Sequence, residues 1–150
     1  MIDGVTVTPL PQFHDERGNV MHMLKTTDSI FEQFGEIYFS AIYPDVVKAW
    51  HIHTRMTLNY AVPIGKIKLV LYDDRPKSPT HGEIQELFLG PYNYCLVTVP
   101  PNIWNGFKGV GTEMSLVANC ASISHDPMEI SRLDPSDNHI PYDWALKQKL

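Results

Sequence analysis

The sequence predicts an all-β fold, a sandwich or a barrel, in a single domain that spans residues 1–150. Short runs of β-branched and aromatic residues recur at roughly ten-residue intervals, and Pro, Gly and Asp signals separate them. No long stretch shows the periodicity of an amphipathic helix. The chain therefore resembles a β container, and the function depends on what that container encloses.

Short segments are predicted to be strands, taken in chain order. The first ends at Pro9 and Pro11, which are disfavoured inside a sheet. A turn at residues 15–18 precedes the second, and a later strand alternates around Ile37, Phe39 and Ala41. The predicted strands are residues 5–8, 19–24, 36–42, 46–53, 59–63, 66–72, 84–89, 95–99, 104–108 and 113–122.

The connections carry signals of their own. Ile64-Gly65 predicts a tight hairpin turn between two strands, and residues 73–82 form a loop by their Pro, Gly and Asp content. Residues 29–34 predict one or two turns of helix, capped by Asp28 or Ser29 and stopped by Gly35. The tail, residues 126–150, is polar and irregular, although residues 140–144 can pack back on the body.

Charge and composition exclude several function classes. A net charge of −5 without a basic run argues against a nucleic-acid-binding face. No apolar run approaches about 20 residues, so no membrane span is expected. The start of the chain lacks a signal-peptide pattern, which makes the cytoplasm the expected location. Cys95 and Cys120 have neither metal spacing nor a disulfide framework, and we expect buried free thiols.

The strand at residues 46–53 carries two histidines that must point the same way, because side chains alternate between the faces of a strand. His51 and His53 therefore bind a ligand, take part in proton chemistry, or pack and hydrogen-bond inside the barrel. Their spacing resembles the first motif of cupins, which are jelly-roll barrels. The acidic ligand of that motif falls on Leu58 and the third histidine on Asn105. Neither suits a transition metal, so the sequence predicts no metal site.

Further motifs resemble those of the dTDP-4-dehydrorhamnose 3,5-epimerase family, metal-independent cupins that act on nucleotide-linked 4-keto sugars. The resemblance covers residues 13–144. It implies a cupin jelly-roll β-barrel with short helical segments, an enzyme without a cofactor, and a homodimer. The motifs are Asp15-x-Arg17-Gly18, Lys48-Ala49-Trp50-His51, Tyr72-Asp73-Asp74-Arg75 with Ser78-Pro79-Thr80-x-Gly82, Trp104-Asn105-Gly106-Phe107 and Asp134-Pro135.

The resemblance also implies the chemistry. A 4-keto group acidifies the protons on C3 and C5; a base removes one, an enolate forms, and an acid on the opposite face returns a proton with inversion. The base falls on His51, whose imidazole suits such a task near neutral pH. A carboxylate that fixes its tautomer and raises its basicity maps to Asp134, with Asp126 and Asp137 as substitutes.

The chain departs from the family where this chemistry is completed. The lysine that stabilises the enolate aligns with Leu58. The region of the acid tyrosine holds Asn119, Cys120 and Ala121. Tyr60 lies two residues from Leu58 and faces the same side, so we predict it as the replacement acid. Loss of the usual acid favours inversion at a single carbon.

The candidate substrate-binding residues are polar or aromatic groups near these positions. Arg17 could reach a diphosphate, and in the family its turn serves the site of the neighbouring subunit. Lys48 replaces a family arginine and keeps its charge without the bidentate fork. Arg55 could stabilise an enolate if its loop folds inward. The full set is Arg17, Lys48, His53, Arg55, Trp104, Asn105 and Asn119.

Three functions stay open at this point. The first is an epimerase or isomerase of a nucleotide-diphosphate 4-keto sugar, in polysaccharide or deoxysugar biosynthesis. The second is a non-catalytic cupin that binds a sugar nucleotide, supported by the missing lysine and tyrosine. The third is a small metal-dependent cupin enzyme that uses His51 and His53.

Overall fold

The computed structural model describes residues 1–145, and every regular element within them is a β-strand. In this part of the chain no helix is long and apolar enough to cross a membrane. The strands are β1 (Thr6–Pro9), β2 (Gln12–Asp15), β3 (Gly18–Met21), β4 (Glu36–Ile42), β5 (Val47–His53), β6 (Leu58–Ile64), β7 (Ile67–Tyr72), β8 (Ile84–Leu89), β9 (Cys95–Val99), β10 (Trp104–Gly109), β11 (Ser115–Ala121) and β12 (Ile130–Arg132).

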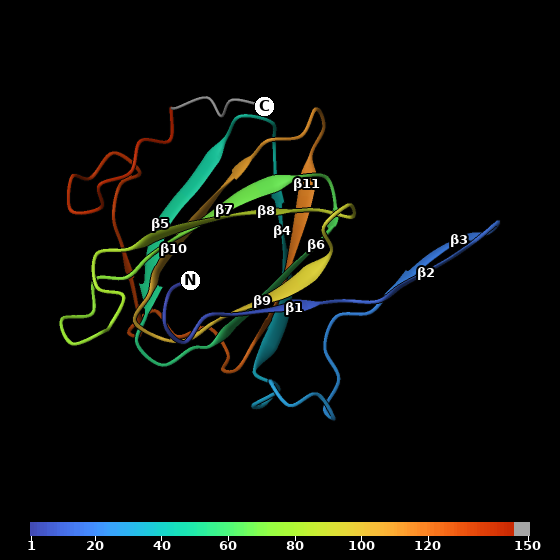
Figure 1. The fold of residues 1–150 in the computed structure, drawn as a ribbon, viewed down its shortest axis with the longest axis horizontal. Coiled ribbons are helices and arrows are strands. Elements are labelled where there is room, and N and C mark those ends of the chain that lie inside the picture. The colour runs from blue at the N-terminus through green and yellow to red at the C-terminus, as the bar shows by residue number, and fades with distance from the viewer. Residues whose placement is uncertain (146–150) are drawn as a thin grey trace.

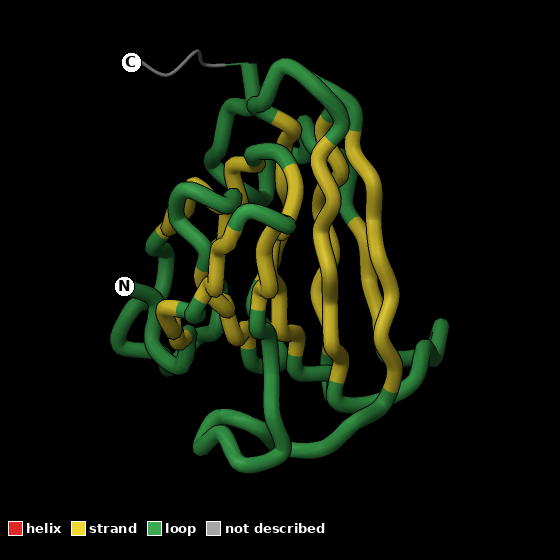
Figure 2. The backbone as a smooth tube through the Cα atoms, turned by 90° about the vertical axis from the view of Figure 1, so that its right-hand side faces the viewer, coloured by secondary structure: helices red, strands yellow, loops and turns green. Residues whose placement is uncertain are grey.

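Two five-stranded antiparallel sheets lie face to face (Figures 1 and 2). One has the order β1-β9-β6-β11-β4 and the other β12-β5-β10-β7-β8. Along the chain, strands mostly alternate between the two sheets, which is the jelly-roll topology that the sequence predicts. The β2–β3 hairpin forms a separate two-stranded sheet that projects away from the barrel (Figure 1).

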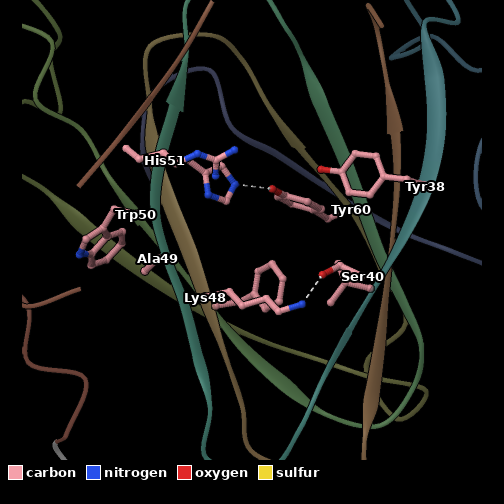
Figure 3. Close-up of a pocket in the computed structure, with 10 residues that line it drawn as sticks. Tyr38, Ser40, Lys48, Ala49, Trp50, His51 and Tyr60 are labelled. Atoms are coloured by element: carbon pink, nitrogen blue, oxygen red, sulfur yellow. Dashed lines mark hydrogen bonds between the residues drawn. The ribbon is translucent and has the colours of Figure 1, made fainter. Parts of the chain in front are cut away.

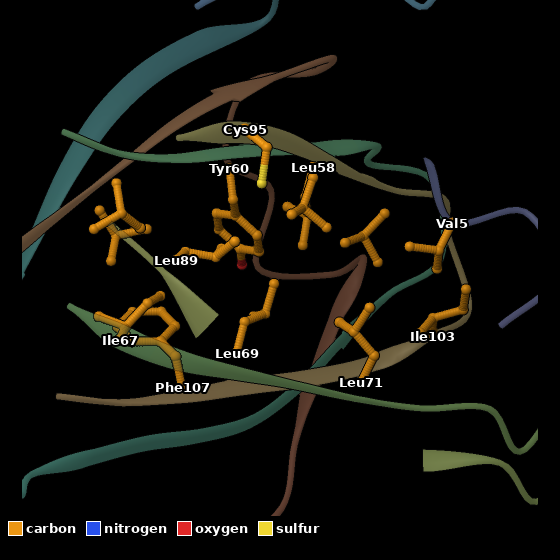
Figure 4. Packing of buried hydrophobic residues seen from close by; sticks show 14 of the residues in the cluster. Val5, Leu58, Tyr60, Ile67, Leu69, Leu71, Leu89, Cys95, Ile103 and Phe107 are labelled. Carbon is orange, nitrogen blue, oxygen red and sulfur yellow. The ribbon is translucent and has the colours of Figure 1, made fainter. Parts of the chain in front are cut away.

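The main core fills the space between the two sheets (Figure 4). It is built by the inward-facing residues of strands from both layers, as alternation requires. Leu58, which aligns with the acidic ligand of the cupin motif, is one of them and is 1% exposed. Each such fully buried Leu or Ile side chain contributes roughly 1.5–3 kcal/mol. The labelled members in Figure 4 are Val5, Leu58, Tyr60, Ile67, Leu69, Leu71, Leu89, Cys95, Ile103 and Phe107.

A second apolar cluster covers the outer face of the β5-β10-β7 sheet. The C-terminal segment supplies Ile140 and Trp144, and the ring of Trp144 lies 5.0 Å from that of Trp50. This confirms that residues 140–144 pack back on the body. Because β7 is covered on both faces, all of its residues are buried. Trp50 faces this cluster, so its neighbour His51 must face the opposite side of β5, toward the interior.

Two expectations about the connections, a hairpin at Ile64-Gly65 and a helix at residues 29–34, differ from the structure. Ile64-Gly65 does not close a hairpin: β6 and β7 belong to different sheets, and the turn carries the chain across the barrel. Gly65 has a φ of 87°, and an added Cβ would lie 2.2 Å from Ser115 Oγ. The strand β12, which pairs with β5, was not predicted, because its residues lie in the polar C-terminal region.

The predicted helix at residues 29–34 is absent, and turns and irregular chain take its place. Side chains hold this segment instead of a helical ladder. Gln33 donates to the carbonyl of Ser122 at 2.8 Å, and Glu32 accepts from Thr57 Oγ1 at 3.2 Å. One or two turns of helix do not repay the cost of nucleation when such contacts compete.

Candidate functional site

A cavity opens between β4, at the edge of one sheet, and β5, close to the edge of the other (Figure 3). It consists of two hollows of about 290 Å³ and about 350 Å³. Both are lined by Tyr38, His51 and Arg132, so these three residues lie where the hollows meet. Two predicted residues, Lys48 and Tyr60, also line the first hollow.

His51 projects from β5 into this cavity (Figure 3). Burial, followed by the electrostatic influence of His53 and Arg132, lowers the pKa of His51 to about 4. The imidazole is therefore neutral throughout the physiological range and always able to accept a proton. The expectation that a neighbouring carboxylate raises its basicity is not met, because burial acts in the opposite direction.

Tyr60 and Asn105 form a buried chain of hydrogen bonds beside His51. The Tyr60 hydroxyl donates to Asn105 Oδ1 at 2.8 Å and lies 3.5 Å from His51 Nε2. Asn105 Nδ2 donates to the carbonyl of His51 at 3.1 Å. Burial raises the pKa of Tyr60 well above its ordinary value. Asn105 therefore supports the strand and the tyrosine, rather than standing in for a metal ligand.

Lys48 spans the gap between the two sheets. Its Nζ donates to Ser40 Oγ at 2.9 Å and to the carbonyl of Ala41 at 2.6 Å, both on β4 (Figure 3). The ammonium lies on the wall of the first hollow. One positive charge is thus placed in the cavity and held by the edge strand opposite β5.

His53 is engaged by Glu129, a carboxylate that the sequence reasoning missed. Glu129 Oε1 pairs with His53 Nδ1, and Oε2 accepts from the backbone amides of Arg55 at 3.1 Å and Met56 at 3.2 Å. Although burial alone would raise it, these hydrogen bonds hold the pKa of Glu129 below its usual value. Glu129 immediately precedes β12, whose Ile130 pairs with His53, and the sequence carried no signal for that pairing.

Tyr38 and Arg132 are the other cavity residues that the sequence reasoning did not single out. Tyr38 lies opposite Asn119 in the β4–β11 register and accepts a hydrogen bond from Asn119 Nδ2 at 3.0 Å. Arg132 lies opposite His51 in the β12–β5 register. Within residues 1–145 no acidic side chain forms an ion pair with Arg132. Glu36 lines the second hollow with it.

Four predicted residues lie away from these hollows. Asp134 accepts from the backbone and hydroxyl of Ser136, at 2.9 Å and 2.5 Å, in an exposed turn. Arg55 forms an exposed ion pair with Asp126 at 2.7 Å. Trp104 belongs to the outer cluster and donates from Nε1 to Asp74 at 2.8 Å. The fourth, Arg17, pairs with Asp15 at 2.6 Å in the projecting hairpin.

The motif at residues 72–82 organises its own loop. Asp73 is fully buried and accepts from Arg75 Nε at 2.8 Å, from Ser78 Oγ at 2.6 Å and from Thr80 Oγ1 at 2.6 Å. These donors, with Arg75 first, hold the pKa of Asp73 far below its usual value. The motif therefore fixes the loop between β7 and β8.

The metal alternative finds few ligands. Across residues 1–145 no three His, Cys, Asp or Glu side chains gather closely enough to hold an ion. His51 and His53 lie 5.8 Å apart by their ring centroids, and the second is already paired with Glu129. A donor set of two nitrogens falls short of the three that a catalytic zinc requires.

Comparison with known proteins places the chain among sugar epimerases. Residues 1–150 match the family model described as dTDP-4-dehydrorhamnose 3,5-epimerase. A probable low-salt glycan biosynthesis epimerase of Haloferax volcanii is 36% identical over 144 residues, which cover 95% of this chain and 89% of that protein. The spore coat polysaccharide biosynthesis protein SpsL of Bacillus subtilis is 31% identical over 143 residues, covering 95% and 91%.

Solved structures agree with this result. A dTDP sugar isomerase of Desulfovibrio desulfuricans is 44% identical and superposes with a TM-score of 0.95, covering 98% of this chain and 94% of that one. A dTDP-6-deoxy-D-glucose-3,5-epimerase of Legionella pneumophila, solved with dTDP-4-keto-L-rhamnose, has a TM-score of 0.85 at 21% identity, covering 99% and 82%. The latter likeness concerns the fold.

Proposed function

Since this chain belongs to the dTDP-4-dehydrorhamnose 3,5-epimerase family and is a nucleotide-sugar epimerase, we propose that the cavity beside His51 is where it inverts a carbon next to a 4-keto group. The observation that carries this proposal is a neutral imidazole directed into a cavity between the two sheets. The names of the two relatives support a sugar destined for a glycan or a coat polysaccharide. A cytoplasmic location stays a prediction.

His51 begins the reaction as the general base. Its nitrogen takes the proton from C3 or C5, the C–H electron pair forms a carbon–carbon double bond to C4, and the keto oxygen becomes an enolate oxygen. General-base catalysis of this kind is worth about 10²–10⁴-fold. An imidazole whose pKa is about 4 is a weak base, so the enolate must be strongly stabilised.

Positive charge in the cavity provides that stabilisation. Arg132 lines both hollows beside His51, and Lys48 lines the first. Cations placed where an oxyanion develops stabilise it. We assign to Arg132 the part of the family lysine that Leu58 has replaced, because Arg132 pairs with His51 across the β12–β5 register and lines both hollows with it.

Hydrogen exchange tests this function. The protein is incubated with a thymidine-diphosphate-linked 4-keto-6-deoxyhexose in deuterium oxide, and label at C3 and C5 is followed by NMR. We expect deuterium at one or both carbons, and loss of the label in His51→Asn. The matched control is His81→Asn, which changes a loop histidine that hydrogen-bonds the carbonyl of Arg75. Binding of the sugar nucleotide without exchange would favour the non-catalytic alternative.

We further propose that two chains form a homodimer through the β2–β3 hairpin and the outer face of β4. Phe13 and Val20 on the hairpin, and Ile37 and Phe39 on β4, are more than half exposed. Large apolar side chains are exposed at both places, as is common where another chain covers the surface. Arg17, in the hairpin turn, would then reach the cavity of the neighbouring subunit.

Light scattering tests the dimer. The wild-type protein is expected at twice the chain mass, and Phe39→Asp at the mass of one chain. Tyr92→Asp is the control, because Tyr92 is equally exposed but lies in the turn between β8 and β9. A wild-type protein with the mass of one chain would rule the dimer out.

A further inference from the structure

Inversion requires a proton donor on the face of the sugar opposite the base. A carbon about 3–3.5 Å from each group places base and acid roughly 6–7 Å apart. The hydroxyl of Tyr60 lies 3.5 Å from His51 Nε2, which is too close for a sugar ring between them. Tyr60 is also only 2% exposed, and its hydrogen is donated to Asn105. Tyr60 therefore holds the base in place and is a poor donor to the far face.

Tyr38 approaches the same cavity from the sheet that faces the base. It extends from β4, in the sheet opposite β5, and Figure 3 shows its hydroxyl directed into the cavity from the side opposite the strand of His51. It lines both hollows together with His51. The residue is 40% exposed, whereas Tyr60 is 2% exposed.

Asn119 orients this hydroxyl. Its Nδ2 donates to the Tyr38 oxygen at 3.0 Å, and its own Oδ1 accepts from the amide of Asn59 at 3.0 Å. The second contact fixes which end of the amide faces Tyr38. Because one lone pair of the phenol oxygen is occupied, the O–H is left to point elsewhere, and the cavity offers the open direction.

We propose that Tyr38 is the general acid of this epimerase and that Asn119 is the residue that positions it. This inference rests on the proposed function of the cavity. The acid tyrosine that the family resemblance places on the last long strand is replaced here by Asn119, and a tyrosine stands opposite it on the neighbouring strand. The hydroxyl has thus moved by one strand while it still faces the same interior.

The step balances without a further reactant. After His51 has taken a proton from the carbon, the enolate carbon attacks the Tyr38 hydrogen from the opposite face. The O–H bond breaks, a new C–H bond forms with inverted configuration, and the C4 carbonyl is restored. Tyr38 is left as a phenolate that accepts the Asn119 hydrogen bond. Solvent then returns a proton to Tyr38 and removes one from His51.

The acidity of Tyr38 suits this role. Burial raises the pKa of Tyr38, while the hydrogen bond from Asn119 acts to lower it. The phenol is therefore protonated at neutral pH and ready to donate. The amide donor stabilises the negative oxygen that follows the transfer.

The test separates proton removal from inversion. Wild-type, Tyr38→Phe, Tyr60→Phe and Tyr92→Phe proteins are incubated with a thymidine-diphosphate-linked 4-keto-6-deoxyhexose in deuterium oxide. NMR measures deuterium uptake and the appearance of the inverted sugar in the same sample. For Tyr38→Phe we expect inversion to fall about 10²–10⁴-fold, with deuterium uptake retained because His51 can return a solvent deuteron to the face it came from.

The other proteins decide the outcome. Tyr92→Phe, which alters an exposed turn, should behave as the wild type. Tyr60→Phe should lower uptake and inversion together, since it disturbs the position of His51. Inversion retained in Tyr38→Phe, or uptake without inversion in Tyr60→Phe, would overturn the assignment while leaving the epimerase function intact. A wild type that takes up no deuterium would overturn both.

Discussion

Replacing Glu129 by alanine should destabilise the protein strongly. The carboxylate is 3% exposed and accepts three hydrogen bonds, from the imidazole of His53 and from the amides of Arg55 and Met56. It thereby fastens the chain that leaves β5 to the segment that enters β12. Alanine removes all three acceptor contacts at once and leaves the donors buried or partly buried.

The magnitude follows from those contacts. A buried donor left without its partner costs about 1–3 kcal/mol, and three donors lose the carboxylate here. We therefore expect Glu129→Ala to lower the free energy of unfolding by about 4 kcal/mol. At roughly 3 °C per kcal/mol for a chain of this size, the Tm should fall by about 12 °C.

Urea unfolding followed by circular dichroism, together with a thermal scan, measures this change. Glu129→Gln is the matched control, because glutamine keeps the shape and one oxygen that can accept from the two amides. Glu129→Gln should lower the free energy of unfolding by about half as much as Glu129→Ala. A loss below about 1 kcal/mol in Glu129→Ala would show that the carboxylate does not fasten these segments and would refute the reasoning.

Three further predictions concern the site and the fold. His51 must be neutral to accept a proton, and its pKa is about 4. The plot of kcat/KM against pH should therefore stay level down to about pH 4 and fall below it. A fall that begins near the ordinary histidine pKa of about 6.5 would contradict this. On the alkaline side, kcat/KM should begin to fall only above pH 10.0, since burial raises the pKa of Tyr38. Lys48→Met should lower kcat by about tenfold or more, because it removes a cation that stabilises the enolate. Lys48→Arg should keep most of the activity, as steady-state kinetics will show. Gly65→Ala should introduce about 1–3 kcal/mol of strain, because the φ of 87° and the side chain of Ser115 leave no room for a Cβ. The Tm in a thermal scan should fall by several degrees. An unchanged Tm would mean that the turn relaxes freely.

Local patterns predicted much of the fold. Strands β4, β8 and β9 were expected at the bounds that the structure has, since alternation and turn residues act within a few positions. The shared face of His51 and His53 was predicted for the same reason, and their rings lie 5.8 Å apart. The loss of a metal ligand at Leu58 was visible as well, because it is a matter of residue type alone.

Alternation marks the two faces of a strand but does not say which of them is buried. In β4 the apolar residues Ile37 and Phe39 face outward, while Tyr38 and Ser40 face the cavity. This edge strand presents its apolar face to the surface that we propose a second chain covers. Tyr38 was therefore overlooked, since its neighbours carried the stronger apolar signal.

The sequence by itself determined the strand-rich container, the family and the imidazole at position 51, because each depends on residue type and short-range spacing. Only the tertiary structure decided the partners of that imidazole. Arg132 lies 81 positions along the chain from His51, and Asn119 lies the same number from Tyr38. Such neighbours are set by the register between strands that meet only on folding, when two sheets bury their inner faces together.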